Sequence, residues 1–188
     1  MKLFWKGGLR IISFLFILKL ILKTVVKRRE DAISIPHATP TEVWEFMADF
    51  SNQKILNPKL LYFQILSDNT NKLRKGYAWT YSVRYTELFE TIPFGTNTAV
   101  GNFSIFQDQK LQDLVIMSEH VTCLLPRETW CLHTLAENRF RFEQTGTEVT
   151  EVVNYSCPWA LQPICTSEID SQRKKVLNNL RHTVFSVL

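Results

Sequence analysis

Strict two-residue periodicity at residues 76–85 limits the fold of this chain more than any other feature. Large aromatic or aliphatic side chains occupy every second position, and small or polar side chains stand between them. Because successive side chains of a β-strand point to opposite faces, this pattern predicts one face toward the interior and one toward water. The predicted inward row is Tyr77, Trp79, Tyr81, Val83 and Tyr85.

Further strands are predicted on both sides of this one. Alternating apolar positions mark them, and turn residues separate them, with Gly146 in a hairpin turn between the last two. Consecutive strands with short connections are typical of an antiparallel sheet with one covered face. The predicted ranges are 32–37, 61–65, 97–107, 114–123, 129–135, 139–144 and 147–157.

Helical segments precede and follow the strands. Thr39, Pro40 and Glu42 match a capping box, in which Thr39 caps the helix and Glu42 returns a hydrogen bond. A short second helix is predicted between residues 49 and 57, before a proline. From Thr166 onward, apolar residues recur along one stripe, which predicts a long amphipathic C-terminal helix.

These elements predict an α+β fold. The C-terminal helix is the only large apolar cover for the sheet. We therefore expect a curved antiparallel sheet of six or seven strands wrapped round this helix. A cleft between sheet and helix, lined by aromatic and aliphatic side chains, would be a site for a small molecule.

Charge is unevenly distributed along the chain. The 188 residues include 22 Lys and Arg and 18 Asp and Glu. Residues 1–29 contain eight of the cations and no acid, so residues 30–188 have 14 cations, 18 acids and a net charge of −4. A mildly acidic body argues against nucleic-acid binding, which depends on clustered Lys and Arg.

Residues 1–29 are predicted to form a membrane-anchor helix with a basic flank, and residues 30–188 a ligand-binding domain. The apolar run over 11–26 is short against the roughly 20 residues of a full span, so the anchor either crosses the bilayer or lies in its interface. A cleaved signal peptide and an ordinary packed helix are the alternatives. The main anchor residues are Ile11, Phe14, Leu15, Phe16, Leu18, Ile21 and Leu22.

The sidedness of the domain rests on charge and cysteine. Four cations mark the C-terminal flank (Lys23, Lys27, Arg28 and Arg29) against three at the N-terminus (Lys2, Lys6 and Arg10), which predicts a cytosolic domain. The N-x-S triplets at Asn102 and Asn154 favour the alternative, a lumenal or secreted domain. The cysteines match no zinc or redox spacing, so free buried thiols are the simplest interpretation. They are Cys123, Cys131, Cys157 and Cys165.

Three local sequences carry a family resemblance. They are residues 39–50 (TPTEVWEFMADF), Lys75-Gly76 before the aromatic strand, and residues 146–150 (GTEVT). With the order of elements, residues 31–188 resemble the helix-grip superfamily of START lipid-transfer domains and polyketide cyclase/dehydrase-like proteins. Many relatives have a Trp shortly before the helix-ending proline, where this chain has none. The resemblance implies one bound hydrophobic molecule, such as a sterol, fatty acyl lipid, isoprenoid or polyphenol.

Residues with catalytic chemistry are few. No nucleophile elbow, phosphate loop or metal-ligand spacing occurs, so no cofactor and no metal are predicted. His120 and His133 lie on separate predicted strands and could approach one another. Glu151 shares its strand face with inward apolar residues, which predicts a buried carboxylate, unless a bulge reverses the alternation. Its candidate partners are Arg84, Arg139 and Arg141.

The predicted function is membrane-tethered binding or transfer of a hydrophobic small molecule in the cleft. A cyclase- or dehydratase-type enzyme that uses Glu151 or a His is one alternative. A membrane-recruited protein-interaction module with a filled core is another. The apolar loop at 89–95 is predicted to gate the cleft or to dip into the membrane. The predicted cavity lining is Tyr77, Trp79, Tyr81, Val83, Phe103, Ile105, Trp130, Glu151, Leu177 and Leu180.

Overall fold

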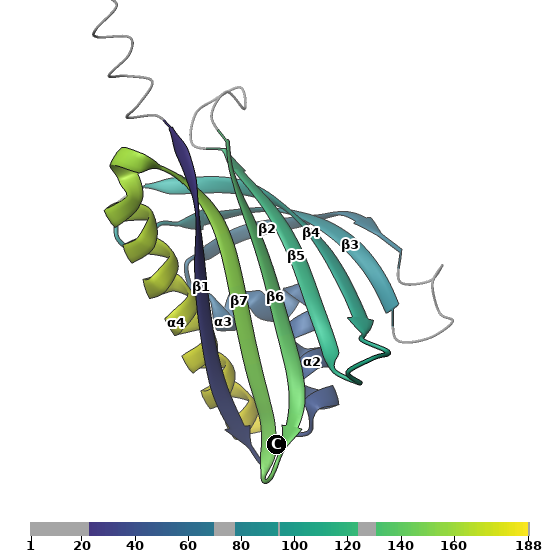
Figure 1. Ribbon diagram of the computed structural model, residues 1–188. Helices are drawn as coiled ribbons and strands as arrows, with labels where there is room; N and C mark the ends of the chain where they lie inside the picture. The colour runs from purple at the N-terminus through teal and green to yellow at the C-terminus, as the bar shows by residue number, and fades with distance from the viewer. Residues whose placement is uncertain (1–22, 70–77, 94, 124–130, 188) are drawn as a thin grey trace, which may run out of the picture.

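The computed structural model describes residues 23–69, 78–93, 95–123 and 131–187. Within these ranges the chain forms a curved sheet of seven strands, in the order β1-β7-β6-β5-β4-β3-β2, with antiparallel neighbours (Figure 1). The strands are β1 (Thr24–Pro36), β2 (Leu60–Asp68), β3 (Ala78–Leu88), β4 (Thr96–Gln107), β5 (Leu114–Cys123), β6 (Cys131–Glu143) and β7 (Gly146–Pro158).

A long C-terminal helix, α4 (Gln162–Val187), follows β7 through the short turn η3 (Trp159–Leu161). It lies against the sheet beside β1 and β7, while α2 (Pro40–Ala48) packs on β5, β6 and β7 (Figure 1). The turn η1 (Phe50–Asn52) and helix α3 (Gln53–Leu56) lead from α2 to β2. The predicted α+β class is confirmed, and a seven-stranded antiparallel sheet with a long C-terminal helix fits the helix-grip fold.

Local sequence explains the start of α2. Glu42 N–H donates to Thr39 Oγ1 at 3.3 Å, and the Thr39 N–H donates to Glu42 Oε2 at 2.8 Å. This is the predicted capping box, and it lowers the pKa of the Glu42 carboxyl because the Thr39 backbone and side chain donate to the charged form.

Besides β1, two elements differ most from their predicted bounds. The strands predicted at 129–135 and 139–144 form one strand, β6, because β5 and β7 pair with it on both sides through Ala136, Glu137 and Asn138. Local propensity there is weak, and pairing on two edges outweighs it. Helix α4 begins at Gln162, four residues before the predicted start at Thr166.

The N-terminal prediction is wrong for the part that the structure describes. Residues 24–29, expected to end a helix and form its basic flank, belong to β1 and pair with β7. Arg29 therefore lies inside the domain, with its side chain 9% exposed. The anchor residues within 1–22 lie outside the described residues. No helix in the described ranges is long and apolar enough to cross a membrane.

The four cysteines form two disulfides, so the interpretation as free thiols is wrong. Cys123–Cys131 joins the end of β5 to the start of β6. Cys157–Cys165 joins the end of β7 to the first turn of α4. Both pairs of cysteines are eight residues apart, and this spacing alone did not predict that they pair. The register of β5 and β6 brings the first pair together, and the turn between β7 and α4 brings the second pair together.

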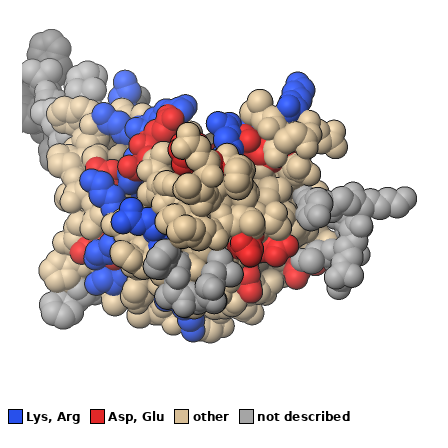
Figure 2. All heavy atoms as spheres, turned by 90° about the horizontal axis from the view of Figure 1, so that it is seen from below, with Lys and Arg blue, Asp and Glu red and all other residues tan. Residues whose placement is uncertain are grey.

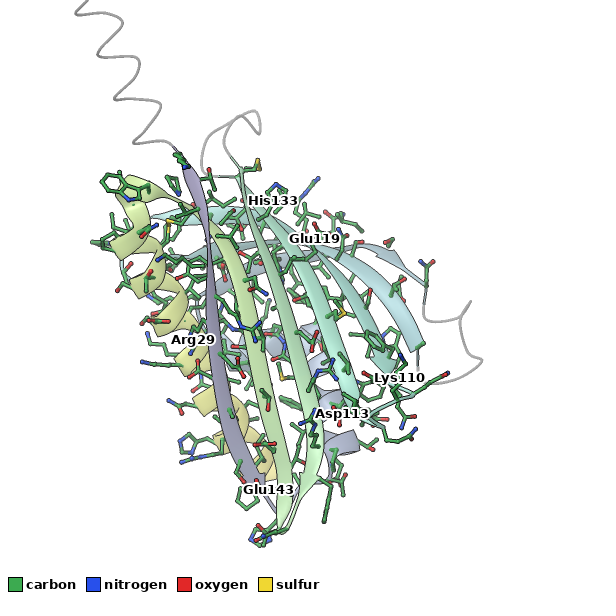
Figure 3. All side chains as sticks on the ribbon, in the orientation of Figure 1. Arg29, Lys110, Asp113, Glu119, His133 and Glu143 are labelled. Carbon is green, nitrogen blue, oxygen red and sulfur yellow. A yellow bond between two sulfur atoms is a disulfide. The ribbon has the colours of Figure 1, made fainter. Side chains whose placement is uncertain are left out.

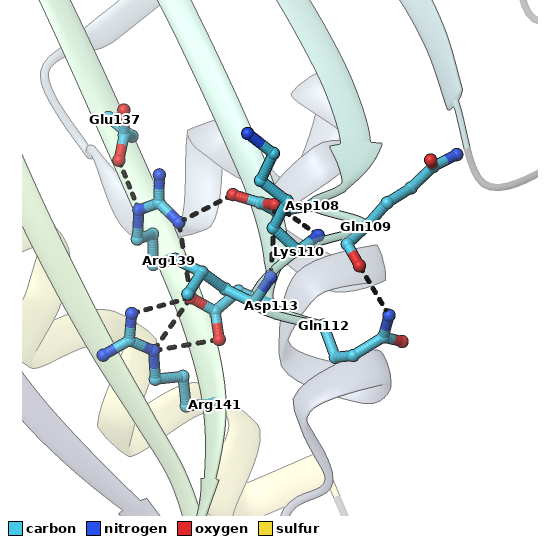
Figure 4. A network of polar contacts seen from close by, with 9 residues as sticks. Asp108, Gln109, Lys110, Gln112, Asp113, Glu137, Arg139 and Arg141 are labelled. Carbon is cyan, nitrogen blue, oxygen red and sulfur yellow. Dashed lines mark hydrogen bonds and ion pairs between the residues drawn. The ribbon is translucent and has the colours of Figure 1, made fainter.

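A network of ion pairs fastens the β4–β5 connection to the outer face of the sheet (Figure 4). Arg141 Nε donates to both carboxylate oxygens of Asp113 at 2.9 Å, and Arg139 Nη1 lies 3.3 Å from Asp108 and from Asp113. Elsewhere on the surface, acidic and basic side chains are interspersed over the face seen from below (Figure 2).

Candidate ligand-binding pocket

A pocket of about 370 Å³ lies between the sheet and the first half of α4. Its mouth is bounded by residues of the β3–β4 connection and by the start of α4, where Ile92 and Ile164 are 41% and 46% exposed. Its inner end is bounded by buried residues of four elements: Met47, Phe50, Ile116 and Val176. The pocket therefore extends from a partly exposed apolar rim to a buried end near α2.

The loop at 89–95 is held to α4 at this mouth. The Glu168 carboxylate accepts hydrogen bonds from the backbone N–H groups of Glu90 and Thr91 at 2.6 and 2.8 Å. Lys175 forms an ion pair with Glu90. Phe89 and Ile92 line the pocket, so the apolar bulk predicted for this loop faces the cavity entrance.

Glu151 is a fully buried carboxylate beside the pocket, as its strand alternation predicts. Its partners are Arg173 of α4, with Nε 3.0 Å from both carboxylate oxygens, and Arg29 of β1, with Nη1 at 3.2 Å. Arg29 lies beside α4 and also pairs with Asp170 at 3.0 Å (Figure 3). Burial lowers the pKa of Arg173, but the charge and hydrogen bonds of Glu151, together with the charges of Tyr85 and Glu87, outweigh burial and raise the pKa.

The predicted arginine partners of Glu151 are wrong. Arg139 and Arg141 alternate with the inward residues of β6 and pair with acids on the outer face. Arg84 is exposed on β3. The β6–β7 register runs without a shift, so the bulge considered as an alternative does not occur.

A chain of polar side chains crosses the pocket wall from β3 to β5. Tyr85 Oη lies 2.9 Å from His120 Nδ1, and His120 Nε2 lies 2.9 Å from Ser118 Oγ. Burial, helped by the positive charge of Arg173, lowers the pKa of His120 to about 4. The imidazole is therefore neutral at pH 7 and has both nitrogens in hydrogen bonds.

Gly101 makes room for this histidine. A Cβ atom at Gly101 would lie 2.9 Å from His120 Nδ1, closer than side chains tolerate. A glycine inside a strand indicates such a close approach, so this signal was present in the sequence. The predicted approach of His120 to His133 is wrong: His120 pairs with Thr134 in the β5–β6 register, and His133 is exposed (Figure 3).

Glu87 is a second buried acid, and unlike Glu151 it lines the pocket itself. Its carboxylate accepts hydrogen bonds from Asn57 at 2.9 Å, from Gln172 at 2.8 Å and from Asn97 at 3.4 Å. Burial raises its pKa, and the three amides oppose that shift. Over the described residues, no group of three His, Cys, Asp or Glu side chains could hold a metal ion.

The predicted lining residues lie mainly in the packed core instead of on the pocket wall. Phe103 lines the pocket, and Glu151 contacts Arg173, which lines it. Because α2 fills the adjacent end of the sheet, the core there contains or contacts Trp79, Tyr81, Val83, Ile105 and Leu180. Leu177 is also buried, whereas Tyr77 and Trp130 lie outside the described residues.

Several polar residues that line the pocket were not predicted from the sequence. Ser118 and Asn138 are 7% and 4% exposed at inward positions of β5 and β6. Each alternates with outward residues, so strand parity could have found them once the inward face was fixed. Arg173 and Gln172 could not be found in this way, because they reach the pocket from α4.

Comparison with known proteins identifies the fold. No protein-family model matches the chain, and no curated protein sequence matches it. Solved structures do match over most of its length, at identities that establish the fold alone. The architecture is that of the helix-grip fold, shared with aromatase/cyclases and with Bet v 1-like proteins.

Three of these structures illustrate the likeness. The Zhui aromatase/cyclase from Streptomyces sp. R1128 has a TM-score of 0.57 at 13% identity, over 85% of this chain and 93% of its own. Norcoclaurine synthase from Thalictrum flavum, in complex with dopamine and hydroxybenzaldehyde, has a TM-score of 0.55 at 10% identity, over 89% and 91%. Ara h 8.0201 has a TM-score of 0.56 at 10% identity, over 86% and 99%.

Proposed function

We propose that this protein binds one hydrophobic small molecule in the pocket between the sheet and α4. The observation that carries the proposal is a cavity of about 370 Å³ with a largely apolar wall and a partly exposed mouth. Pockets of roughly 300–1,000 Å³ with few polar groups are typical of small-molecule sites. Norcoclaurine synthase, with the same fold, was solved with two small aromatic molecules, which supports this class of ligand.

Filling the pocket tests the proposal. Ala136 lines it from β6, whereas Thr98 is exposed on the outer face of β4. We expect native mass spectrometry of the purified full chain to show a bound small molecule that Ala136→Phe loses. Thr98→Phe adds the same ring outside and should retain the ligand. Equal retention by both variants, with both folded, would refute binding in this pocket.

Carrier activity is favoured over catalysis by the state of the ionisable groups. The negative charge of Glu151 is balanced by two arginines. Burial lowers the pKa of His120 to about 4, so its imidazole is a weak base at pH 7. A cavity also counts against the interaction module with a filled core. We further propose that the ligand is transferred between a membrane and this pocket.

A cyclase- or dehydratase-type enzyme is the second candidate. The hydrogen-bonded series Tyr85–His120–Ser118 in the pocket wall favours it, because it could move a proton between ligand and wall. His120→Gln distinguishes the two functions. An enzyme should lose turnover of a candidate substrate while the ligand still binds, whereas a carrier has no turnover to lose.

The place where the chain enters the domain supports a membrane tether. The Trp159 backbone N–H donates to the Lys23 carbonyl at 2.9 Å, which fixes Lys23 beside η3. Leu161 of η3 and Ile164 of α4 line the pocket, so residues 1–22 join the domain near its mouth. We expect the full chain to float with lipid vesicles and Leu18→Glu/Leu22→Glu to stay in solution. Flotation of both would refute the tether.

The two disulfides support an oxidising compartment for this domain. They use all four cysteines of the chain, and disulfides persist mainly in secreted, lumenal or periplasmic proteins. This favours the lumenal or secreted alternative over the cytosolic prediction. Asn102 is exposed within an N-x-S triplet. In a eukaryotic secretory host we expect a glycosidase-sensitive form that Asn102→Gln loses, and unglycosylated, reduced protein would refute this location.

A further inference from the structure

The series Tyr85–His120–Ser118 in the pocket wall has one more donor proton than it uses. Burial raises the pKa of Tyr85 and lowers that of His120, so both are neutral at pH 7, and each of the three side chains then has one donor proton. Two hydrogen bonds join them, Tyr85 Oη with His120 Nδ1 and His120 Nε2 with Ser118 Oγ, each at 2.9 Å. Three protons and two hydrogen bonds leave one proton at an end of the series, whichever imidazole nitrogen is protonated. Among the described residues, no further group accepts a hydrogen bond from Tyr85 or Ser118.

The acidity of the two hydroxyl groups decides which end of the series has the unused proton. A phenol is a stronger acid than an alkyl alcohol, so Tyr85 is the better donor to the imidazole. His120 Nδ1 then accepts from Tyr85, while Nε2 carries the imidazole proton and donates it to Ser118 Oγ. The Ser118 O–H has no acceptor left within the series, and Ser118 lines the pocket.

The surroundings of Ser118 hold the series in place and leave room for a ligand. Ser118 is 7% exposed and lies on β5 between Phe103 of β4 and Ala136 of β6 in the strand register. Ala136 also lines the pocket and has only a methyl group as its side chain, so a ligand has space beside the Ser118 hydroxyl. The His120 ring lies edge-on to Phe103 and Tyr85, with ring centroids 5.3 and 5.8 Å apart. The donor therefore has a fixed position on the wall.

We infer that Ser118 donates a hydrogen bond to a carbonyl oxygen of the ligand, such as that of a ketone, an aldehyde or an ester. This inference rests on the proposed function and adds to it the chemical class of the ligand and the residue that recognises it. A hydroxyl donor without an acceptor in a largely apolar wall is unfavourable, and an acceptor oxygen on the ligand removes that cost. Ser118 separates ligands with a carbonyl group from equally apolar ones without an acceptor.

The charges of the pocket favour a neutral acceptor over an ion. Arg173 is the cation of the lining among the described residues, and burial together with its charge lowers the pKa of His120. The negative end of a carbonyl dipole is favourable in this positive field, whereas an ammonium group is not. Glu87 and Glu168 also line the pocket, and Arg173 is already paired with Glu151. A ligand carboxylate would thus be buried near acids without a free cation, which is unfavourable.

Two probes that differ only in the acceptor test the inference. 2-Acetylnaphthalene has a carbonyl group, and 2-isopropenylnaphthalene has a CH₂ group of similar size in place of the oxygen. Each is titrated calorimetrically into the full chain in lipid nanodiscs, with empty nanodiscs subtracted. Ser118→Ala should lower the ratio Kd(alkene)/Kd(ketone) by about threefold to tenfold, the usual effect of one hydrogen bond. Hydration of the ketone and partition of both probes into lipid are the same for every variant, so they cancel when the ratios are compared.

A control variant and a spectroscopic measurement keep the test decisive. Thr134→Val removes a different hydroxyl from the pocket lining and should leave the ratio unchanged. Infrared spectra of the wild-type complex cover the case that Ser118→Ala does not fold. The C=O stretch of the bound ketone, isolated by isotope labelling of the carbonyl carbon, should lie below its position in hexane, because a donated hydrogen bond weakens the C=O bond. Thr134→Val should not move this band.

The outcomes separate this inference from the proposed function. If both probes bind and the folded Ser118→Ala variant keeps the wild-type ratio, the inference is overturned and the binding function stands. A carbonyl band at its hexane position in the wild-type complex also overturns it. If Tyr85→Phe lowers the ratio and Ser118→Ala does not, the unused proton lies at the other end of the series, and the assignment to Ser118 is wrong. If neither probe binds the wild-type chain, the proposed function fails for this class of ligand, and the inference fails with it.

Discussion

Replacing Glu151 by glutamine should destabilise the domain more than any other single removal of charge. The carboxylate is fully buried, and Arg173, which is 21% exposed, forms an ion pair with no other acid among the described residues. Arg29 keeps Asp31 and Asp170 when Glu151 is neutralised, so Arg173 becomes the unpaired buried cation. Removing one partner of a buried ion pair costs about 3–5 kcal/mol. For a chain of this size, that corresponds to a Tm lower by about 6–20 °C.

Urea denaturation of Glu151→Gln, followed by tryptophan fluorescence, measures this loss. No reductant is added, so that both disulfides stay intact. The double variant Glu151→Gln/Arg173→Met removes the unpaired cation and should recover at least half of the stability, since a buried pair replaced by neutral side chains is often tolerated. Glu30→Gln is the matched control, because its partner Arg28 is 62% exposed and an exposed pair contributes little. A loss below about 1 kcal/mol, or a double variant less stable than the single one, would refute the reasoning.

Three further predictions concern stability. The pKa of His120 is about 4 in the folded state and about 6.5 in the unfolded state, so the unfolded chain binds more protons between these pH values. The free energy of unfolding, measured by urea titration, should therefore fall as the pH drops from about 6.5 to 4. His120→Asn should flatten this part of the pH profile. Cys157→Ser/Cys165→Ser should lower the free energy of unfolding by about 2–3 kcal/mol, and an unchanged urea midpoint would contradict a formed disulfide. Tyr81→Phe should cost about 1 kcal/mol in the same assay without weakening ligand binding, because its hydroxyl donates to the Ala48 carbonyl at 2.8 Å in the core.

Most of the fold could be predicted because its signals are local. The capping box at Thr39 and the apolar run that opens β5 each depend on a few neighbouring residues, and both elements were placed within a residue or two. The start of β1 could not be found in this way. After Thr24, two valines and three basic residues follow one another without the alternation that marks a strand, so the strand structure of residues 24–29 comes from pairing with β7.

The pocket was predicted in kind but misplaced along the sheet. Strand parity identifies the inward face, yet it gives no information about which part of that face is covered. The structure shows that α2 covers the end near Tyr81 and Val83, where Trp44 packs edge-on against Trp79 with ring centroids 5.1 Å apart. The packing of α2 on strands far away in the sequence decides where the cavity remains. The periodicity of the sequence carries no information about this long-range packing.

The position of the covalent and ionic links explains how the cavity persists. A hollow end of a domain lacks the apolar packing that normally holds its elements together, so its walls need other links. Cys157–Cys165 fixes the first turn of α4 to β7 at this end, and Glu168 fixes the β3–β4 connection to α4. Because these links bind the rim rather than fill the interior, they hold the entrance together without occupying the space. A ligand that binds there would then add the missing apolar contacts and raise the stability of the domain as its concentration increases.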